Sequence, residues 1–274
     1  MTPSIRLASV AMLAAAASAL ALGAAHSQRL SRHDGVTVTF LANEGVMLEG
    51  GGRKVLIDAL FLKYKTGFAL PADSTQRALQ GARPPFHDVD LVLATHHHGD
   101  HFHPAPMAAH LRANPGATLL STRQVVDSLR GRIAASDPVS RRILARALPD
   151  GAHRREVVDG ITVELLGLRH HDIDHLGYIV EIGGRRVLHV GDTDRAERSF
   201  PALRLDTARI DVALLPEWMV RDERGRAAIE RWIGPKHVVA FHVGEGDGPG
   251  TERAVGAAYP GAITFVRPLE THRW

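Results

Sequence analysis

The sequence predicts a layered α/β fold in which two packed β-sheets are each covered by helices on their outer face. Two observations lead to this prediction: a strand, strand, glycine turn, strand pattern that occurs twice, and helical segments that lie between and after the two copies. The chain has 274 residues, of which 45% are hydrophobic and 23% charged, so it can bury a large core. No stretch of the folded part has the length and composition of a linker.

The first copy of the pattern lies in residues 36–57. Residues 36–40 alternate in a β-branched pattern, residues 45–49 form a second run, and residues 54–57 form a third after a turn of three glycines. The same order returns about 125 residues later, in residues 161–166, 178–182 and 186–190. The segment GGRKVLID of the first copy is echoed by GGRRVLHV in the second. An internal duplication is therefore predicted.

Helices are predicted where apolar residues recur at three- and four-residue spacing or where proline opens a segment. Four such segments lie between the copies: residues 73–79, 104–113, 124–134 and 138–147. After the second copy, a helical segment at residues 224–232 separates two predicted strands, residues 210–215 and 237–241. A further strand, residues 88–94, leads into a cluster of histidines.

The N-terminal segment has the form of a secretory signal peptide. Arg6 is the only charged residue before Arg29, and the stretch between them is rich in Ala and Leu and ends in small residues. We therefore expect residues 1–27 to be a signal peptide, residues 28–274 to form one domain, and the mature protein to be periplasmic or secreted without stable membrane insertion. An uncleaved anchor is the alternative, since about 20 apolar residues can cross a bilayer.

Composition excludes several classes of function. The chain has no cysteine, so it contains no disulfide, thiolate nucleophile or iron–sulfur cluster, and a metal site must be built from His, Asp and Glu. Its 33 Lys and Arg residues against 30 Asp and Glu residues leave a net charge of only +3, with no long basic run, so no nucleic-acid partner is expected. Histidine, with 17 residues, is unusually frequent.

Five of these histidines lie in the eight residues 96–103, HHHGDHFH, directly after the strand DLVLAT. His96 and His98 are two apart in extended chain and can point the same way, whereas the glycine that follows allows a turn that brings Asp100 and His101 to a second position. Imidazole is a common ligand of zinc-like metals, so two adjacent ligand sets are predicted. A surface loop that binds metal loosely is the alternative, but it would need neither the fixed Asp and Gly nor the strand.

The motif His96-x-His98-x-Asp100-His101 resembles the H-x-H-x-D-H signature of the metallo-β-lactamase superfamily, and the resemblance covers nearly the whole predicted mature chain. It implies a four-layer αββα sandwich of two mixed β-sheets flanked by helices, and a hydrolase as the activity of the domain. The segment LANEGVMLEGGGRKVLIDALF is similar to the family's first hairpin, which ends in a structural Asp, here Asp58.

The resemblance also implies the remaining metal ligands. The segment LLGLRHHDIDHLGYIVEI offers His170 and His171 for the family's third histidine; we favour His170, although sequence alone does not separate the two. HVGDTD makes Asp192 the carboxylate that bridges two metals, and FHVGEGDG makes His242 the last ligand. One metal then receives His96, His98 and His170, the other receives Asp100, His101 and His242, and Asp192 lies between them.

The implied activity is that of an exported hydrolase with two divalent cations, for which Zn²⁺ is best suited and Mn²⁺ or Fe are alternatives. Metal-bound hydroxide would attack an ester, lactone, amide or phosphoester bond of a small or lipid-like substrate. Asp100 is expected to orient this nucleophile in addition to binding metal. Two other readings stay open: a metal-binding or sequestration protein without turnover, and a β-lactamase that uses only His and Asp ligands.

Neighbouring histidines receive other expected roles. His97 alternates away from the ligand pair and is expected to pack or to support a ligand from behind. His103 and His175 are expected at a solvated rim. His189 lies within an apolar strand and is expected to be a hydrogen-bonded interior residue, which can orient a ligand.

Two further segments have two possible roles each. Glu217 and Trp218 follow a strand and either line the substrate cleft or are structural. Residues 60–71, apolar and aromatic, form either a flap over the cleft or a covering loop. The first hairpin carries Asn43, Glu44 and Gly45, where some subgroups of the family have His or Asn followed by a small residue.

Overall fold

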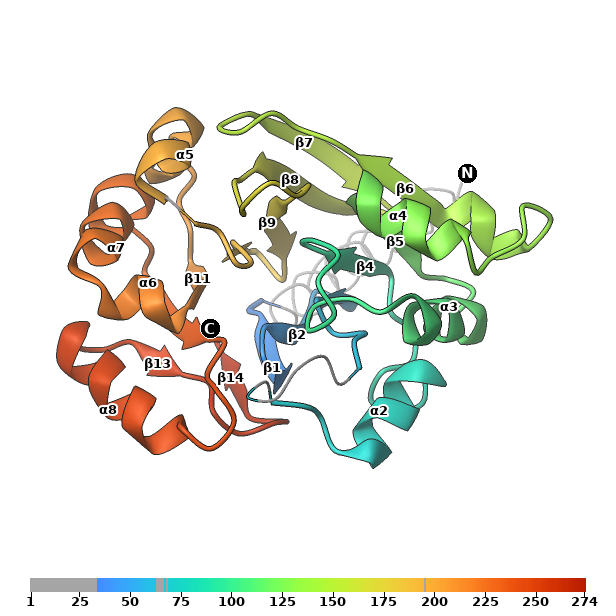
Figure 1. Ribbon diagram of the computed structural model, residues 1–274, viewed down its shortest axis with the longest axis horizontal. Coiled ribbons are helices and arrows are strands. Elements are labelled where there is room, and N and C mark those ends of the chain that lie inside the picture. Colours follow the sequence, from blue (N-terminus) through green and yellow to red (C-terminus); the bar gives the residue numbers. More distant parts are fainter. Residues whose placement is uncertain (1–33, 63–66, 68, 195) are drawn as a thin grey trace, which may run out of the picture. The chain divides into compact units, whose positions relative to one another are not determined.

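Two mixed seven-stranded β-sheets pack face to face, with helices on both outer faces, in the computed structural model of the chain (Figure 1). The structure describes residues 34–62, 67, 69–194 and 196–274. This arrangement confirms the predicted four-layer sandwich. The predicted signal peptide, residues 1–27, lies outside the described residues, as does part of the predicted flap at residues 60–71. Within the described part of the chain, no helix is long and apolar enough to cross a membrane.

The first sheet has the strand order β14-β1-β2-β3-β4-β5-β6. Its strands are β1 (Thr37–Ala42), β2 (Gly45–Gly50), β3 (Arg53–Ile57), β4 (Leu91–Ala94), β5 (Thr118–Thr122), β6 (Ile143–Arg146) and β14 (Thr271–Arg273). Neighbours are antiparallel from β14 to β3 and parallel from β3 to β6.

The second sheet has the strand order β13-β12-β11-β10-β9-β8-β7. Its strands are β7 (His153–Val158), β8 (Ile161–Gly167), β9 (Leu176–Ile182), β10 (Arg185–His189), β11 (Val212–Pro216), β12 (His237–Phe241) and β13 (Ile263–Thr264). From β7 to β10 neighbours are antiparallel, and from β10 to β13 they are parallel.

Both sheets therefore have three antiparallel contacts followed by three parallel ones, which supports the predicted internal duplication. The glycine turns of the two copies also meet: a Cβ added to Gly50 would lie 3.0 Å from the Cα of Gly183. Only glycine allows the two turns to approach so closely.

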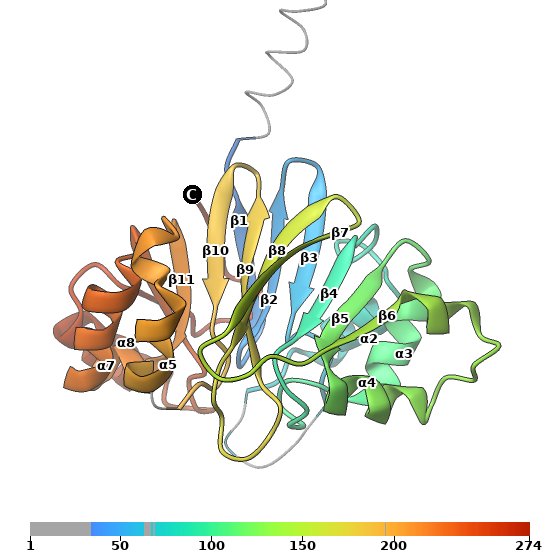
Figure 2. The same ribbon diagram turned by 90° about the horizontal axis from the view of Figure 1, so that it is seen from above.

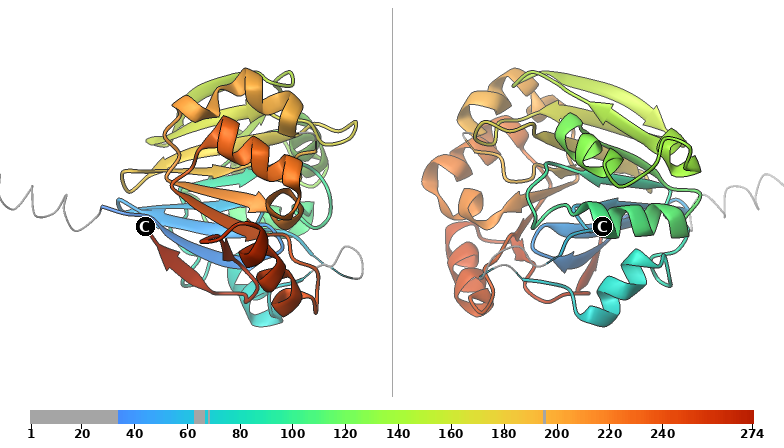
Figure 3. Two further views of the ribbon diagram at one scale, coloured as in Figure 1. Left: turned by 90° about the vertical axis from the view of Figure 1, so that its left-hand side faces the viewer. Right: turned by 45° about the vertical axis from the view of Figure 1, so that its right-hand side comes forward.

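α-Helices of five to eleven residues and short turns cover the outer faces (Figure 2; Figure 3 shows each side in turn). The first sheet is covered by α2 (Asp73–Gln80), α3 (Pro104–Ala113) and α4 (Arg123–Arg130). The second is covered by α5 (Ala196–Leu203), α6 (Glu217–Arg221), α7 (Glu223–Ala228), the π-helical turn η3 (Ile229–Ile233) and α8 (Gly248–Ala258). Two 3₁₀ turns, η1 (Pro138–Arg142) and η2 (Leu205–Thr207), complete the described elements.

Three apolar layers hold these elements together. Tyr178 and Phe241 belong to the layer between the sheets, Met107 to the layer under α2–α4, and Phe200 to the layer under α5–α8. Because successive side chains of a strand point to opposite faces, the central strands are apolar on both sides and read as continuous runs such as LVLA. The strand ends that carry the site are thus fixed by a rigid scaffold.

The predicted helix at residues 138–147 is wrong. Asp137 accepts a hydrogen bond from the Val139 amide and so caps the short turn η1, after which residues 143–146 add a parallel strand to β5. Ile143 packs into the layer under α2–α4, whereas Leu144 packs against the layer between the sheets. The apolar residues of this segment therefore lie on the two faces of a strand and not on one face of a helix.

Candidate metal centre

All seven residues expected to bind metal lie in loops at one edge of the two sheets. His96, His98, Asp100 and His101 follow β4, and the other three residues follow strands of the second sheet: His170 after β8, Asp192 after β10 and His242 after β12. These strands run in the same direction within each sheet, so their carboxyl ends converge. The side chains form two groups whose potential ligand atoms lie within 4.8 Å of one another in each group.

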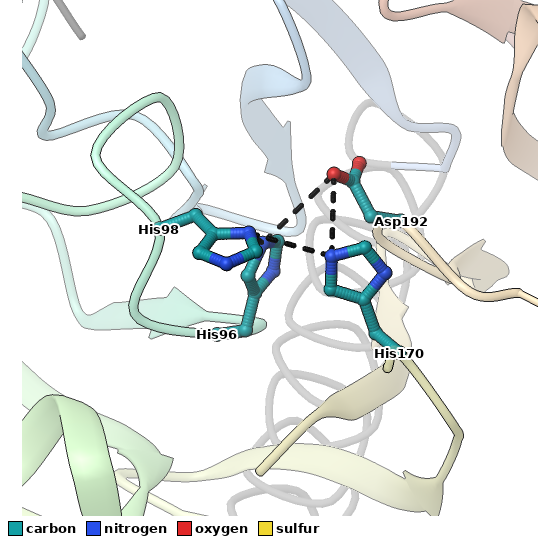
Figure 4. Close-up of side chains that lie close together, drawn as sticks. All are labelled: His96, His98, His170 and Asp192. Atoms are coloured by element: carbon teal, nitrogen blue, oxygen red, sulfur yellow. Dashed lines mark hydrogen bonds and ion pairs between the residues drawn. The ribbon is translucent and has the colours of Figure 1, made fainter. Parts of the chain in front are cut away.

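The first group consists of His96, His98, His170 and Asp192 (Figure 4). The Nδ1 atom of His98 lies 3.1 Å from Nε2 of His96 and 3.3 Å from Nε2 of His170. Asp192 Oδ2 lies 3.9 Å from Nε2 of both His96 and His170. Burial lowers the pKa of all three histidines, that of His96 most strongly, so their rings are neutral and can donate lone pairs to a cation.

The second group consists of Asp100, His101, Asp192 and His242. Asp192 Oδ1 lies 3.3 Å from Nε2 of both His101 and His242, and Asp100 Oδ2 lies 3.4 Å and 3.6 Å from the same two atoms. Burial alone would lower the pKa of His242, but the two carboxylates raise it to about 10. Burial likewise opposes ionisation of Asp192, yet His101 and His242 hold its pKa well below the usual value. The second group thus contains two carboxylates, whereas the first contains one.

Asp192 belongs to both groups, because Oδ2 faces the first and Oδ1 faces the second. The preceding Gly191 makes this placement possible. It has a φ of +60°, and a Cβ at this position would lie 2.5 Å from His175 Nε2 and 2.9 Å from Oγ1 of Thr95. Any larger residue would push the loop, and Asp192 with it, away from the histidines.

Asp58, at the end of β3, organises the centre from behind. Its carboxylate accepts hydrogen bonds from the Thr95 amide at 2.7 Å and the Thr95 hydroxyl at 2.6 Å, and from Nδ1 of His101 at 2.9 Å. The last contact fixes the ring of His101 with Nε2 turned toward the second group. Thr95 Oγ1 also lies 3.0 Å from Nδ1 of His96, so one buried carboxylate orients histidines of both groups. This is the structural role expected of Asp58.

The residues present fit two divalent cations. Buried polar atoms are normally hydrogen-bonded, yet His101 Nε2 and Asp192 Oδ1 find no hydrogen-bond partner of good geometry among the described residues. The donor set of imidazole nitrogens and carboxylate oxygens suits zinc and similar metals. Each group offers four ligand residues with the shared Asp192 counted in both.

The structure separates the adjacent histidines that sequence alone left open. His170 turns its ring into the first group, whereas the side chain of His171 is 71% exposed and lies 3.6 Å from Asp194. His97 is exposed and belongs to neither ligand group, and its ring lies 5.4 Å from that of the ligand His98, as expected of a residue that packs beside a ligand. His103 is half-buried and accepts a hydrogen bond from the Ala105 amide, which makes it the N-cap of α3.

His175 was expected at a solvated rim, but it is buried and only 5% exposed. It directly precedes β9, and the missing side chain of Gly191 leaves room for its ring next to that of His96, 5.3 Å away. Burial lowers its pKa to about 3. The prediction for His189 is confirmed: its buried ring donates to the Glu44 carbonyl at 3.0 Å and accepts from the Gly191 amide at 3.2 Å.

Glu217 and Trp218 take different roles. Glu217 pairs with Arg221 at 2.8 Å within α6 and is structural. Trp218 is 39% exposed and its ring lies 4.8 Å from that of His242, so it lines the open side of the second group.

Two residues of the centre, Asn43 and Glu44, were missed as functional residues. They form the turn between β1 and β2, far from the histidine motif in sequence. The side chain of Asn43 donates to Asp100, and Glu44 is buried beside His101. The available signal was an Asn and a Glu, both polar, in the middle of an otherwise apolar hairpin.

A family model described as the β-lactamase superfamily domain matches residues 53–250. Curated relatives include two UPF0173 metal-dependent hydrolases. The one from Pyrococcus abyssi is 26% identical over 220 residues, which cover 76% of this chain and 84% of the relative. The one from Heliobacterium modesticaldum is 27% identical over 245 residues, covering 86% and 92%.

Solved structures share the fold. The metallo hydrolase Igni18 from Ignicoccus hospitalis matches with a TM-score of 0.59 and 21% identity, covering 88% of this chain and 98% of that one. The metallo-β-lactamase fold protein YhfI from Bacillus subtilis matches with a TM-score of 0.60 and 12% identity, covering 88% of this chain and all of the other. The resemblance drawn from the histidine motif is therefore confirmed.

Proposed function

The chain belongs to the β-lactamase superfamily of metal-dependent hydrolases, and from this premise we propose that it binds two divalent cations and cleaves an ester, lactone, amide or phosphoester bond. The observation that carries the proposal is the position of Asp192, which turns one oxygen to each of two ligand groups. A single cation would not require a carboxylate shared in this way. Zinc suits the nitrogen and oxygen ligands best, and manganese or iron are alternatives.

The chain's own residues would perform three tasks. His96, His98 and His170 hold the first cation position, and Asp100, His101 and His242 hold the second, with Asp192 shared. When bound, divalent cations at these positions would lower the pKa of a coordinated water toward about 7 and stabilise negative charge on the substrate. Asp58 and Asn43 keep the ligands in place, which is the preorganisation that catalysis requires.

Asp100 would also orient the attacking water. Its carboxylate is fixed by the Asn43 amide and lies between His101 and His242, at 3.4 Å and 3.6 Å from their Nε2 atoms. Burial opposes ionisation of Asp100, but hydrogen bonds from the two histidines lower its pKa well below the usual value. An ionised carboxylate at this position accepts a hydrogen bond from water and directs its lone pair toward the substrate.

The substrate that we propose is a small or lipid-like molecule met outside the cytoplasm. A cavity of about 250 Å³ lies beside the loop that follows His242, and most of the residues that line it are apolar residues or glycines. Its lining includes Phe40, Leu70, Val243, Phe265 and Val266. The exposed ring of Trp218, 4.8 Å from that of His242, is a separate apolar surface, and an apolar group of the substrate is proposed to bind there or in the cavity. The sequence of residues 1–27 supports export to the periplasm or beyond.

The proposal is tested by metal analysis and hydrolysis on one preparation. We expect two equivalents of metal per chain, together with hydrolysis of at least one of nitrocefin, a lactone, a p-nitrophenyl ester and bis-p-nitrophenyl phosphate. A chelator should abolish this activity and added metal should restore it. His96→Ala and Asp192→Ala should each abolish turnover while circular dichroism stays unchanged. Asp172→Ala, an exposed carboxylate in the loop that carries His170, is the matched control and should keep full activity.

Two results would contradict the proposal. Wild-type rates in Asp192→Ala would remove this residue from the centre. Two bound metals without hydrolysis of any substrate would favour the alternative function, a metal-binding or sequestration protein without turnover.

A further inference from the structure

Glu44 is a buried carboxylate of the centre that neither ligand group uses. It is 0% exposed, and neither carboxylate oxygen has a hydrogen-bond partner among the described residues. Its closest ion-pair contact is between Oε2 and Nδ1 of His101, at 3.8 Å. Burying a carboxylate without hydrogen bonds or a close opposite charge is strongly unfavourable. Burial raises the pKa of this carboxyl group well above its usual value, and a nearby cation would compensate for its charge.

The backbone around Glu44 fixes the side chain in the interior. The Glu44 carbonyl accepts a hydrogen bond from His189 at 3.0 Å. The preceding Asn43 has a φ of +53°, and a Cβ on the following Gly45 would lie 2.9 Å from the Asp58 carbonyl oxygen. The tight turn and its contact with the end of β3 therefore keep Glu44 beside His101 and away from solvent.

The two ligand groups differ in what lies behind their histidines. In the first group, Nδ1 of His96 lies 3.0 Å from the neutral hydroxyl of Thr95. In the second group, Nδ1 of His101 faces two carboxylates, Asp58 at 2.9 Å and Glu44 at 3.8 Å. Because Nε2 of the same ring faces the second cation position, a negative charge behind Nδ1 strengthens this ring as a ligand. Glu44 therefore contacts a histidine of the second group, and its effect is expected mainly at the second position.

We propose that Glu44 is a positioning residue that acts through His101 to tighten the binding of a divalent cation at the second position. This inference rests on the proposed binding of two cations. Removal of a carboxylate that supports a ligating histidine typically weakens metal binding by about 10- to 100-fold. Since Glu44 is farther from Nδ1 than Asp58 is, we expect an effect at the lower end of this range.

The test uses Glu44→Gln, which keeps the shape of the side chain and replaces its carboxyl group by an amide that does not ionise. Zn²⁺ affinity is measured by competition with a chromophoric chelator in two backgrounds, each with one position disabled. In His98→Ala, where the second position is intact, Glu44→Gln should weaken binding about tenfold. In His242→Ala, where the first position is intact, the same change should alter affinity less than about twofold. Glu49→Gln, a half-buried carboxylate on the same hairpin, is the matched control and should have no effect in either background.

A second readout separates this role from a merely structural one. Thermal unfolding of the metal-free protein should show Glu44→Gln at least as stable as wild type, because the unpaired buried carboxylate is gone, and the stabilisation by added Zn²⁺ should be smaller. A structural role predicts the opposite, a lower melting temperature without metal. Glu44→Met, of similar length and without polar atoms, should behave in the same way and serves if the glutamine variant folds poorly.

Three outcomes overturn the inference: equal weakening in both backgrounds, no weakening in either, or a loss of metal-free stability with unchanged affinity. If wild type binds two zinc ions and Glu44→Gln changes nothing, only the role of Glu44 fails. If wild type binds no zinc, the proposed function fails and this inference with it.

Discussion

Asn43 and Asp100, 57 residues apart in the chain, are joined by two hydrogen bonds. The Asn43 Nδ2 atom donates to the backbone carbonyl oxygen of Asp100 and to its Oδ2 atom, each at 3.2 Å. The turn between β1 and β2 therefore holds the loop that carries the histidine motif. Asp100 is oriented by this turn as well as by its own loop.

Asn43→Ala should weaken zinc binding at the second position several-fold and lower the free energy of unfolding by about 1 to 3 kcal/mol, because two buried acceptors lose their donor. Chelator competition and urea unfolding measure the two effects. Asn114→Ala is the control, since this buried side chain donates to the Val89 carbonyl away from the centre. It should lose a similar amount of stability and keep its zinc affinity. Equal zinc affinity in both variants would rule out the positioning role of Asn43.

Gly191→Ala should lower turnover at least about tenfold, because the added Cβ meets His175 and Thr95 and displaces Asp192. Gly234→Ala separates this effect from backbone strain. Gly234, which follows the turn η3, also has a positive φ, +57°, but a Cβ there would meet no atom within 4 Å. This control should lower the free energy of unfolding by only about 1 to 2 kcal/mol, the strain of an alanine in the left-handed region, and should leave turnover nearly unchanged. Steady-state rates and thermal unfolding distinguish the two, and similar rates would refute the steric argument.

Trp218→Ala should raise KM for apolar substrates about fivefold or more while kcat changes less than about twofold, because the exposed ring beside His242 offers binding area but no chemical group. Trp218→Phe should restore most of the affinity. The measurement is a full Michaelis–Menten analysis on the best substrate of the panel. A fall in kcat at constant KM would instead show that Trp218 affects the reacting atoms.

The pH dependence of stability should change in His110→Gln. His110 is buried in α3, its Nδ1 donates to the Leu79 carbonyl at 2.6 Å, and burial lowers its pKa. The unfolded chain, with a His pKa of about 6.5, takes up a proton that the folded chain refuses, so wild-type stability falls as pH drops below about 6.5.

Through His110, the free energy of unfolding changes by at most about 1.4 kcal/mol per pH unit, and this change is absent in His110→Gln. Urea unfolding of both proteins at pH 7.5, 6 and 5 should therefore show a steeper decline for wild type. Parallel declines would mean that His110 is protonated in the folded state as easily as in the unfolded chain.

Much of the fold followed from patterns that are local in sequence. Residues 237–241 were predicted as a strand with the observed bounds, and the echo of GGRKVLID in the second half predicted two similar sheets. Such patterns are readable because a strand alternates its side chains and a glycine turn reverses it, whatever lies around them. The prediction of a helix at residues 138–147 is wrong because the same apolar spacing occurs in a helix and in a half-buried edge strand, and only the free edge of β5 decides between them.

The sequence by itself determined which residues of the motif leave a strand together: His96, His98, Asp100 and His101 are neighbours in the chain, and their spacing sets their directions. Only the tertiary structure decided which of His170 and His171 faces them, and that His175, Asn43 and Glu44 are buried at the same centre. The packing of two sheets brings these residues together. The direction and burial of their side chains depend on contacts between segments far apart in the chain, which no local spacing encodes.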